Sequence, residues 1–393
     1  MKIKHKKEKS KDFSFNFRSD GVRSLYVHIP FCNRICTYCD FNKVLIKNQP
    51  VDKYIDALIK EINQFDTVPL KTIYVGGGTP TALSLQQLEK LLLAINDKFG
   101  LVEEYTFEAN PDELTTEKIS LLKDYGVNRI SLGVQTFNNE LLKVLGRTHN
   151  FSDIYKSIEH MNKIGLDNYS IDLMYNLPGE TIKDIDDSLN NIEILQPKHI
   201  SWYSLIIEPH TVFYNKINRG QLSIGSPIKE GEIYNKVIDG LENLGYPQYE
   251  ISNFSKEKYE SEHNKTYWLN EQYLAAGAGS HGYIGNKRYY NIKPVPHYIK
   301  AMEETGNVVK ETIELSKNNM MEEEMFLRLR LNEGVSTNRF KEKFDINIED
   351  VFGQAIKKHI QLNHLKEFNN HIALTDSGRM VGNDVFVDFL LSD

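Results

Sequence analysis

The sequence predicts an α/β protein: an open partial barrel of six strand–helix units, followed by a smaller mixed and largely helical domain. Two observations predict this fold. Six apolar, strand-like runs alternate with helix-period segments up to about residue 220, and parallel strands need helical crossovers of this kind. No clear seventh or eighth unit follows, so we expect an open barrel rather than the closed eight-stranded one.

The six expected strands are short apolar runs. They cover residues 25–29, 72–75, 105–108, 129–134, 169–174 and 199–206. Between them, residues 51–65 repeat apolar side chains at the helical period, and Ser84 with Gln87 predicts a capping box at the start of the next helix. Gly126 and Gly165 stand where helix C-caps precede a strand. These signals give the order of strand and helix that a parallel sheet requires.

The pattern changes after Gly220, and we expect residues 226–393 to form a second domain that ends in a winged-helix-like module, residues 311–393. The expected elements of the module are helices at 336–344 and 349–360 and a hairpin of residues 365–368 and 371–374 that turns at Asn369-Asn370. From Ser336 onward the chain has seven basic and nine acidic residues. Nucleic-acid binding by this module is therefore not expected.

The overall composition excludes several classes of protein. The formal net charge of −7 argues against a general nucleic-acid binder, and no apolar run approaches the roughly 20 residues that span a bilayer. Residues 1–20 carry a net charge of +4 without the apolar region of a secretory signal. We therefore expect a cytoplasmic protein, not an integral membrane protein, with a disordered basic tail, residues 1–23, before a core of residues 24–225.

All three cysteines of the chain fall in one short segment directly after the first strand. Cys32, Cys36 and Cys39 form a CxxxCxxC pattern, so their thiolates can converge on one metal centre. Zinc would need a fourth ligand, for which His28 is the only near candidate. A cubane iron–sulfur cluster held by three thiolates instead leaves one iron free to bind another group. Incidental thiols near the core are the third alternative.

Polar residues stand near the C-terminal ends of the strands that follow. A Gly-Gly-Gly-Thr-Pro run at residues 76–80 follows the second strand, Glu108 and Gln135 end the third and fourth, and Asp172 lies on the fifth. A buried charge is unfavourable unless it is paired, and barrel enzymes assemble their sites at this end of the strands. We expect these residues to face one site, although each could instead be a satisfied core group.

These motifs resemble the radical S-adenosylmethionine (radical SAM) superfamily, and more narrowly its oxygen-independent coproporphyrinogen III oxidase family. The segments that carry the resemblance are Leu25–Cys32, Gly76–Pro80, Glu108–Pro111, Gly133–Gln135 and Asp172–Glu180. The resemblance implies that the three cysteines hold a 4Fe-4S cluster whose open iron binds SAM. It also implies SAM contacts from Tyr26, Gly77, Gly78, Thr79, Glu108, Gln135, Arg147 and Asp172.

Two features depart from the oxidase and resemble its HemW-type heme chaperone branch. Oxidases of the family have a fourth cysteine where this chain has Phe41, and they carry a longer N-terminal extension. His263-Asn264-Lys-Thr-Tyr267-Trp268 matches the HNxxYW signature of the chaperone branch. A neutral imidazole can ligate heme iron, so the resemblance implies His263 as heme ligand, with His281 as a competing candidate.

The expected function is therefore that of a heme chaperone, which binds heme and transfers it to an acceptor apoprotein such as a respiratory-chain component. Its expected cofactors are a 4Fe-4S cluster, SAM and heme. The alternative is a radical SAM oxidative decarboxylase, the oxygen-independent coproporphyrinogen III oxidase. A zinc-stabilised structural protein is a third class. The sequence leaves open whether SAM is cleaved and whether the protein is a homodimer.

Overall fold

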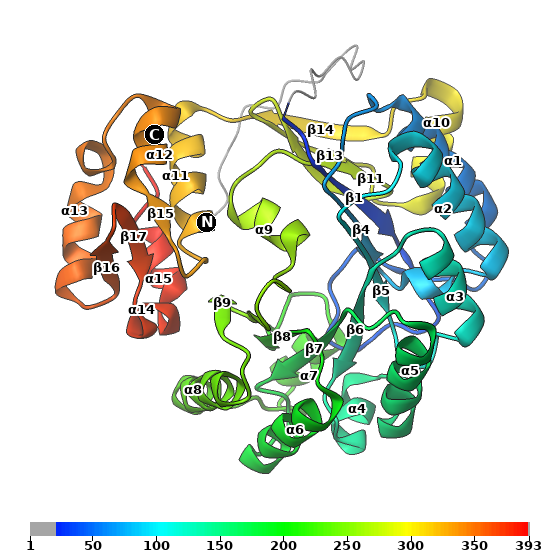
Figure 1. Cartoon of the computed structure of the whole chain (residues 1–393), viewed down its shortest axis with the longest axis horizontal. Coiled ribbons are helices and arrows are strands. Elements are labelled where there is room, and N and C mark those ends of the chain that lie inside the picture. Colours follow the sequence, from blue (N-terminus) through cyan, green and yellow to red (C-terminus); the bar gives the residue numbers. More distant parts are fainter. Residues whose placement is uncertain (1–20, 392–393) are drawn as a thin grey trace.

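A computed structural model describes residues 21–391 of the chain. The predicted disordered tail, residues 1–23, lies outside the described residues except for its last three. Figure 1 shows a strongly curved central sheet with helices around its outer face, and a separate group of helices that carries the C-terminus. No helix in residues 21–391 is long and apolar enough to cross a membrane.

The central sheet has nine strands in an open arrangement. Their order is β11 (Leu274–Ala276), β1 (Ser24–Ile29), β4 (Thr72–Gly77), β5 (Glu104–Ala109), β6 (Arg129–Gln135), β7 (Tyr169–Tyr175), β8 (His199–Ser204), β10 (Asn253–Ser255) and β9 (Gln248–Glu250). The six predicted strands are present and pair in parallel as neighbours. The predicted open partial barrel is therefore confirmed.

Helices cover the outer face of this sheet (Figure 1). They are α1 (Val51–Gln64), α2 (Leu85–Phe99), α3 (Thr116–Asp124), α4 (Asn139–Leu145), α5 (Phe151–Ile164) and α6 (Ile182–Leu195). The predicted capping box forms at the start of α2, where Ser84 and Gln87 exchange hydrogen bonds between side chain and backbone. Gly126 and Gly165 have φ of 86° and 75°, as expected for residues that end helices.

Three short strands of the sheet come from the region after residue 225 and were not predicted. β11 pairs in parallel with β1, and β10 pairs antiparallel with β8 and β9. Each of these strands has only three residues, which is too short to show a period-2 pattern. The central sheet thus continues past the boundary at residue 225 that the sequence predicts, and that boundary stays a prediction.

The remaining elements surround the barrel and build the C-terminal module. They are β2 (Phe31–Cys32), β3 (Val44–Leu45), α7 (Val212–Asn218), α8 (Pro227–Asn243), α9 (Glu262–Trp268), β12 (His281–Ile284), β13 (Lys287–Asn291), α10 (Val295–Thr305), β14 (Val309–Glu314), α11 (Lys317–Arg328), β15 (Val335–Ser336), α12 (Thr337–Phe344), α13 (Ile348–Gln361), β16 (Leu365–Phe368), β17 (His371–Leu374), α14 (Asp376–Met380) and α15 (Gly382–Val387), with a short 3₁₀ turn at Pro80–Ala82.

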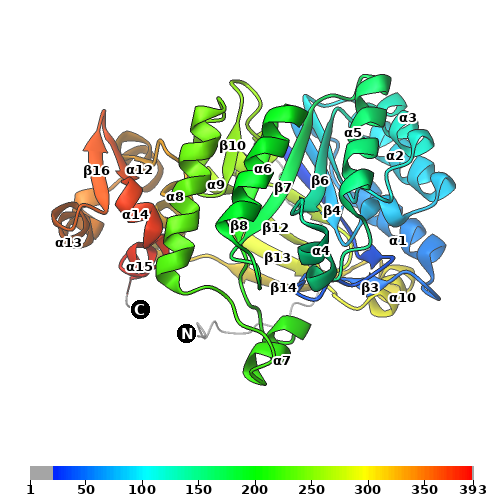
Figure 2. The same ribbon diagram turned by 90° about the horizontal axis from the view of Figure 1, so that it is seen from below.

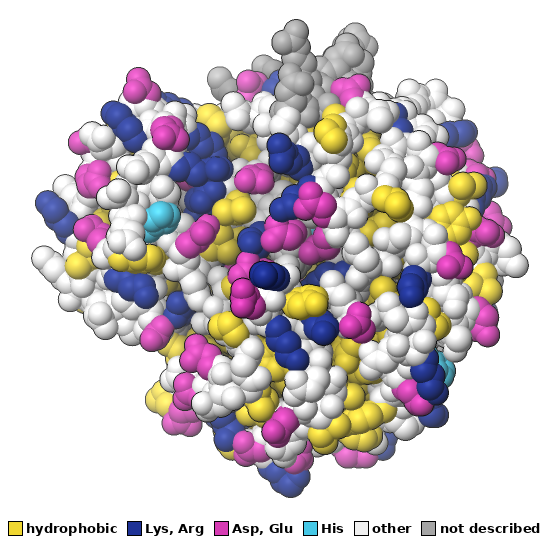
Figure 3. Space-filling model, in the orientation of Figure 1, with side chains coloured by type: hydrophobic (Ala, Val, Ile, Leu, Met, Phe, Trp, Pro, Cys, Tyr) yellow, Lys and Arg dark blue, Asp and Glu magenta, His cyan; other side chains and the backbone are white. Residues whose placement is uncertain are grey.

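The C-terminal module, α11 to α15, has a hydrophobic core of its own. Figures 1 and 2 show it beside α8, on the side of the barrel away from α1 to α3. Its predicted hairpin forms between β16 and β17, where Asn369 and Asn370 adopt φ of 46° and 60°. On the face in Figure 3, acidic and basic side chains are interspersed over barrel and module.

Candidate functional site

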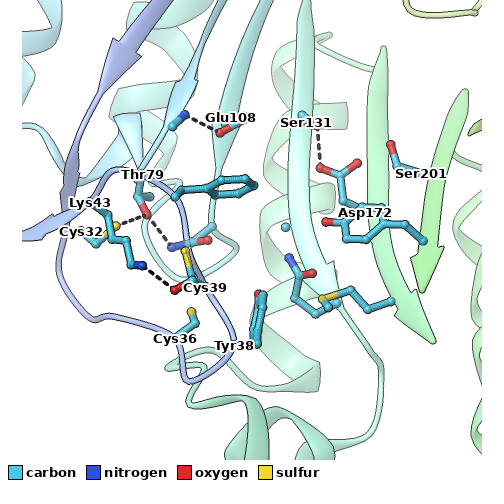
Figure 4. Close-up of a pocket in the computed structure, with 18 of the residues that line it drawn as sticks. Cys32, Cys36, Tyr38, Cys39, Lys43, Thr79, Glu108, Ser131, Asp172 and Ser201 are labelled. Atoms are coloured by element: carbon cyan, nitrogen blue, oxygen red, sulfur yellow. Dashed lines mark hydrogen bonds between the residues drawn. The ribbon is translucent and has the colours of Figure 1, made fainter. Parts of the chain in front are cut away.

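The three cysteines follow β1 closely: Cys32 is the last residue of β2, and Cys36 and Cys39 lie on the loop between β2 and β3. Short pairing of β2 with β3 fixes both ends of the loop, and Thr37 N donates to Leu145 O at 3.0 Å. Cys32, Cys36 and Cys39 have free thiols. All three line one cavity of about 580 Å³, at whose edge Figure 4 shows them.

Hydrogen-bond donors face two of the sulfurs. Thr79 Oγ1 donates to Cys32 Sγ, and Arg147 Nη1 donates to Cys36 Sγ, both at 3.6 Å. Burial raises the pKa of the Cys32 thiol to about 12, although the hydrogen bond from Thr79 lowers this pKa. A metal centre that replaces the thiol proton would stabilise the ionised sulfur.

This donor set fits an iron–sulfur cluster. Three thiols of one short segment surround one end of a roomy cavity, and a hydroxyl and a guanidinium offset the negative charge of thiolates. Within residues 21–391, no three His, Cys, Asp or Glu side chains are arranged to hold a single metal ion. In a cluster, each thiolate instead binds a different iron.

The glycine run at the end of β4, residues 76–78, brings backbone close to the same cavity. Gly77 has φ of 115°, and a Cβ there would lie 2.4 Å from the His28 ring, so only glycine fits. Gly77 N donates to Glu108 Oε2 at 2.9 Å, and Tyr74 donates to Glu108 Oε1 at 2.8 Å. Burial raises the pKa of Glu108 to about 7, although both hydrogen bonds favour its ionised form.

Gln135 at the end of β6 and Asp172 in the middle of β7 supply two further polar groups. Gln135 has φ of 67° at a bulge of β6, an uncommon conformation outside glycine that is concentrated at functional sites. Its Oε1 is buried without a hydrogen-bond partner among the described residues. Asp172 accepts hydrogen bonds from Ser131 at 2.6 Å and Ser170 at 2.8 Å, while burial raises its pKa.

The first cavity therefore brings most of the predicted site residues together. It is lined by Cys32, Cys36, Cys39, Gly77, Gly78, Thr79, Glu108, Gln135, Arg147 and Asp172. Tyr26 does not line this cavity. It borders a second cavity of about 560 Å³ that shares Phe41, Gly77 and Glu108 with the first. Phe41, whose side chain is 65% exposed, thus stands between the two.

Aromatic and histidine side chains dominate the wall of this second cavity. They are Tyr26, His28, Phe41, Tyr267, Trp268, Tyr273, His281 and Phe326. His281 is exposed and stacks on Tyr290 with ring centroids 5.3 Å apart. Burial and the nearby cations Lys293 and Arg288 lower the pKa of His281, which favours the neutral imidazole.

His263 is enclosed and lines neither cavity. Its side chain is fully buried on α9, and hydrogen bonds of 2.8 Å join its Nδ1 to Thr72 Oγ1 and its Nε2 to Tyr267 Oη. Burial lowers its pKa to about 3. In this conformation neither ring nitrogen of His263 is free to bind a metal, because Thr72 and Tyr267 occupy both of them.

Sequence reasoning did not single out several residues of the first cavity. Arg129 at the start of β6, Ser201 on β8, Asn253 on β10 and Asn264 on α9 line its wall. Arg129 could have been identified from the sequence, because it is a charged residue at the start of a strand that is predicted to be buried. Asn264 belongs to the HNxxYW segment, although no cavity role was expected for it, and no local pattern distinguishes Ser201 or Asn253, since their strands come together only in the fold.

Three comparisons relate the chain to known proteins. Residues 26–192 match the model of the radical SAM superfamily, and residues 315–381 match the HemN C-terminal domain. Heme chaperone HemW of Lactococcus lactis is 47% identical, with 94% of this chain and 98% of that protein covered. Heme chaperone HemW of Bacillus subtilis is 46% identical, with 94% and 99% covered. The solved structure of coproporphyrinogen III oxidase (HemN) from Escherichia coli superposes with a TM-score of 0.82 at 25% identity, covering 94% of this chain and 90% of that one.

Proposed function

The chain belongs to the family of heme chaperones HemW within the radical SAM superfamily, and on this premise we propose that it binds heme and transfers it to an acceptor apoprotein. The observation that carries the proposal is the pair of adjoining cavities. One is bounded by the cysteine loop, and the other by aromatic rings and an exposed histidine. Such a pair suits a protein that holds two cofactors next to each other.

In this proposal Cys32, Cys36 and Cys39 hold a 4Fe-4S cluster. When bound, a cluster on three thiolates offers one open iron that can bind SAM. Thr79 and Arg147 donate hydrogen bonds to sulfur, and charge-assisted hydrogen bonds of this kind favour the thiolate form.

The first cavity supplies the groups that orient SAM. Gln135 has an unpartnered buried oxygen that can accept a hydrogen bond from a ligand, and Asp172 presents a carboxylate held by two serines. The remaining residues proposed to contact SAM are Gly77, Gly78, Thr79, Glu108 and Arg147, with Tyr26 on the side of the second cavity.

The second cavity is the proposed heme site. Tyr267 and Trp268 of the HNxxYW segment line it, and flat apolar faces suit a macrocycle. Arg288 lies on the same wall, where its guanidinium, bound in a bidentate pair to Glu323 at 2.8 and 2.7 Å, keeps its positive charge. Of the two candidate ligands, the geometry favours His281, because His263 would first have to give up both of its hydrogen bonds.

Titration of the cluster-loaded protein with heme tests the proposal. We expect about one heme per chain and a changed heme spectrum in His281→Ala. The exposed His297 serves as control, since His297→Ala removes an imidazole that lines neither cavity. A changed spectrum in His263→Ala but not in His281→Ala would instead assign ligation to His263. Absence of heme binding would refute the chaperone function.

The oxidase alternative is tested separately with coproporphyrinogen III, SAM and a reductant. Phe41 offers no thiol at the position of the fourth cysteine, and its exposed ring borders both cavities. A substrate that is misplaced by about 1 Å can react on the order of a hundredfold more slowly. We therefore expect no conversion. Robust decarboxylation would favour the enzyme instead.

A further inference from the structure

The wall of the first cavity carries a positive charge without a partner. Arg129, the first residue of β6, is 2% exposed and lines this cavity. Its Nε is buried with no hydrogen-bond acceptor, and within residues 21–391 its side chain forms no hydrogen bond or ion pair. A buried charge without a partner is strongly unfavourable, so such a group points to a ligand.

The nearby carboxylate does not fill this role. Asp172 feels the positive charge of Arg129, which lowers its pKa against the dominant effect of burial. Its oxygens, however, accept hydrogen bonds from Ser131 and Ser170, and it forms no ion pair with Arg129. The guanidinium donors therefore remain available to a molecule in the cavity.

The surrounding wall is polar and lies away from the cysteines. Figure 4 shows Ser131 and Ser201 on the side of the cavity opposite the cysteine loop. Asn264 lines the same cavity and carries an amide nitrogen that can donate a hydrogen bond. A guanidinium and an amide N–H on the wall of one cavity are suited to bind an anionic oxygen group.

We propose that Arg129 anchors the carboxylate of a ligand that occupies the first cavity. A guanidinium binds a carboxylate through two parallel hydrogen bonds. The carboxylate belongs either to a propionate of a heme that extends from the second cavity into the first, past the shared residues Phe41, Gly77 and Glu108, or to a separate small acid. Only the first source rests on the proposed function.

The heme arm of the test compares heme with its dimethyl ester, in which both propionates are blocked. If Arg129 holds a propionate, the wild-type protein binds heme about tenfold or more tightly than the ester, the effect of one charge-assisted contact. Arg129→Gln abolishes this preference and Arg129→Lys retains part of it. The exposed Arg219 provides the control, and Arg219→Gln keeps the preference.

The second arm uses no heme and titrates the cluster-loaded protein with sodium propionate by calorimetry. If the ligand is a small acid, propionate binds the wild-type protein and Arg219→Gln equally. It binds Arg129→Gln about tenfold or more weakly, while Arg129→Lys restores part of the affinity. Cluster content, measured as iron per chain, shows that each variant is folded.

The two arms separate the possible outcomes. Dependence on Arg129 in either arm supports the carboxylate site and identifies its source. If the protein binds no heme, the proposed function fails while the propionate arm still decides this inference. If heme and its ester bind equally well and propionate binds independently of Arg129, the site is refuted.

Discussion

Cys36 is partly exposed, and its sulfur receives a hydrogen bond from Arg147, so its substitution tests the cluster site. Cys36→Ala removes one of three thiolates. We expect iron bound after anaerobic reconstitution to fall from about four atoms per chain to nearly none, with loss of the visible absorption. Lys47→Ala, an exposed change outside the cavity, is the control. Zinc without iron or sulfide in the wild-type protein would contradict the cluster.

Glu61 is a buried carboxyl group that makes stability depend on pH. It accepts hydrogen bonds from Gly277 N at 2.8 Å, Asn291 Nδ2 at 2.6 Å and the Tyr298 hydroxyl, and so ties α1 to the segment before His281. Burial raises its pKa from 4.5 to about 7, despite these hydrogen bonds. Between these two values the folded protein holds a proton that the unfolded chain has lost.

The contribution of Glu61 to the free energy of unfolding should therefore fall as pH rises from about 4.5 to 7, and stay level above. The loss amounts to about 3 kcal/mol, because the pKa of Glu61 rises from 4.5 to about 7 on folding. Glu61→Gln cannot ionise, so denaturant unfolding at pH 5 and pH 8 should show a smaller pH dependence than in the wild-type protein. The exposed change Glu303→Gln should leave it intact. Equal pH dependence in Glu61→Gln would show that Glu61 does not titrate in this range.

The helix α9 is held at its start by a carboxylate of the neighbouring sheet. Glu104 on β5 accepts hydrogen bonds from the backbone N of Glu262 at 2.8 Å and of His263 at 3.0 Å. A negative charge is favourable at the N-terminus of a helix, where backbone N–H groups lack partners. This contact fixes a short helix that presents Asn264 to the first cavity and Trp268 to the second.

Glu104→Gln removes this charge and should lower the free energy of unfolding by about 2 kcal/mol. Heme binding should also weaken, because α9 carries two aromatic residues of the second cavity. Chemical denaturation and heme titration measure the two effects. The neighbouring exposed Glu103 is the matched control, and an equal loss in Glu103→Gln would argue against a specific role of Glu104.

The C-terminal module is joined to the barrel through a buried ion cluster. Glu324 on α11 is fully buried and forms ion pairs with Arg328, Arg339 and Lys343. Arg328 and Arg339 also donate to the backbone oxygen of Leu269, which ends α9. The same cluster therefore links the module to the helix that borders both cavities.

Glu324→Ala leaves three cations without their shared partner and should destabilise the protein by about 3–5 kcal/mol. Hydrogen exchange should show the loss of protection in α9 as well as in α11. Glu342→Ala, an exposed change on α12, is the control. A loss confined to α11 would mean that the cluster stabilises the module without holding it to α9.

The sequence by itself determined the six parallel strands, the first helix, three further helix ends and the segment that carries the cysteines. These features depend on local signals: apolar runs, caps and motif spacing act over a few residues. The positions of Glu108 and Gln135 near strand ends followed as well, because parallel strands end at one edge of a sheet, whereas Asp172 lies in the middle of β7.

Only the tertiary structure decided which residues are enclosed and which face a cavity. His263 contacts Thr72, which is 191 positions away in the chain. The motif alone would assign the His263 imidazole as a heme ligand, but this contact occupies one of its nitrogens. Arg129 likewise lines a cavity whose wall includes residues of β8, β10 and α9, which lie far from it in the chain. Burial and hydrogen-bond partners depend on segments distant in sequence, and no local pattern specifies which of them meet.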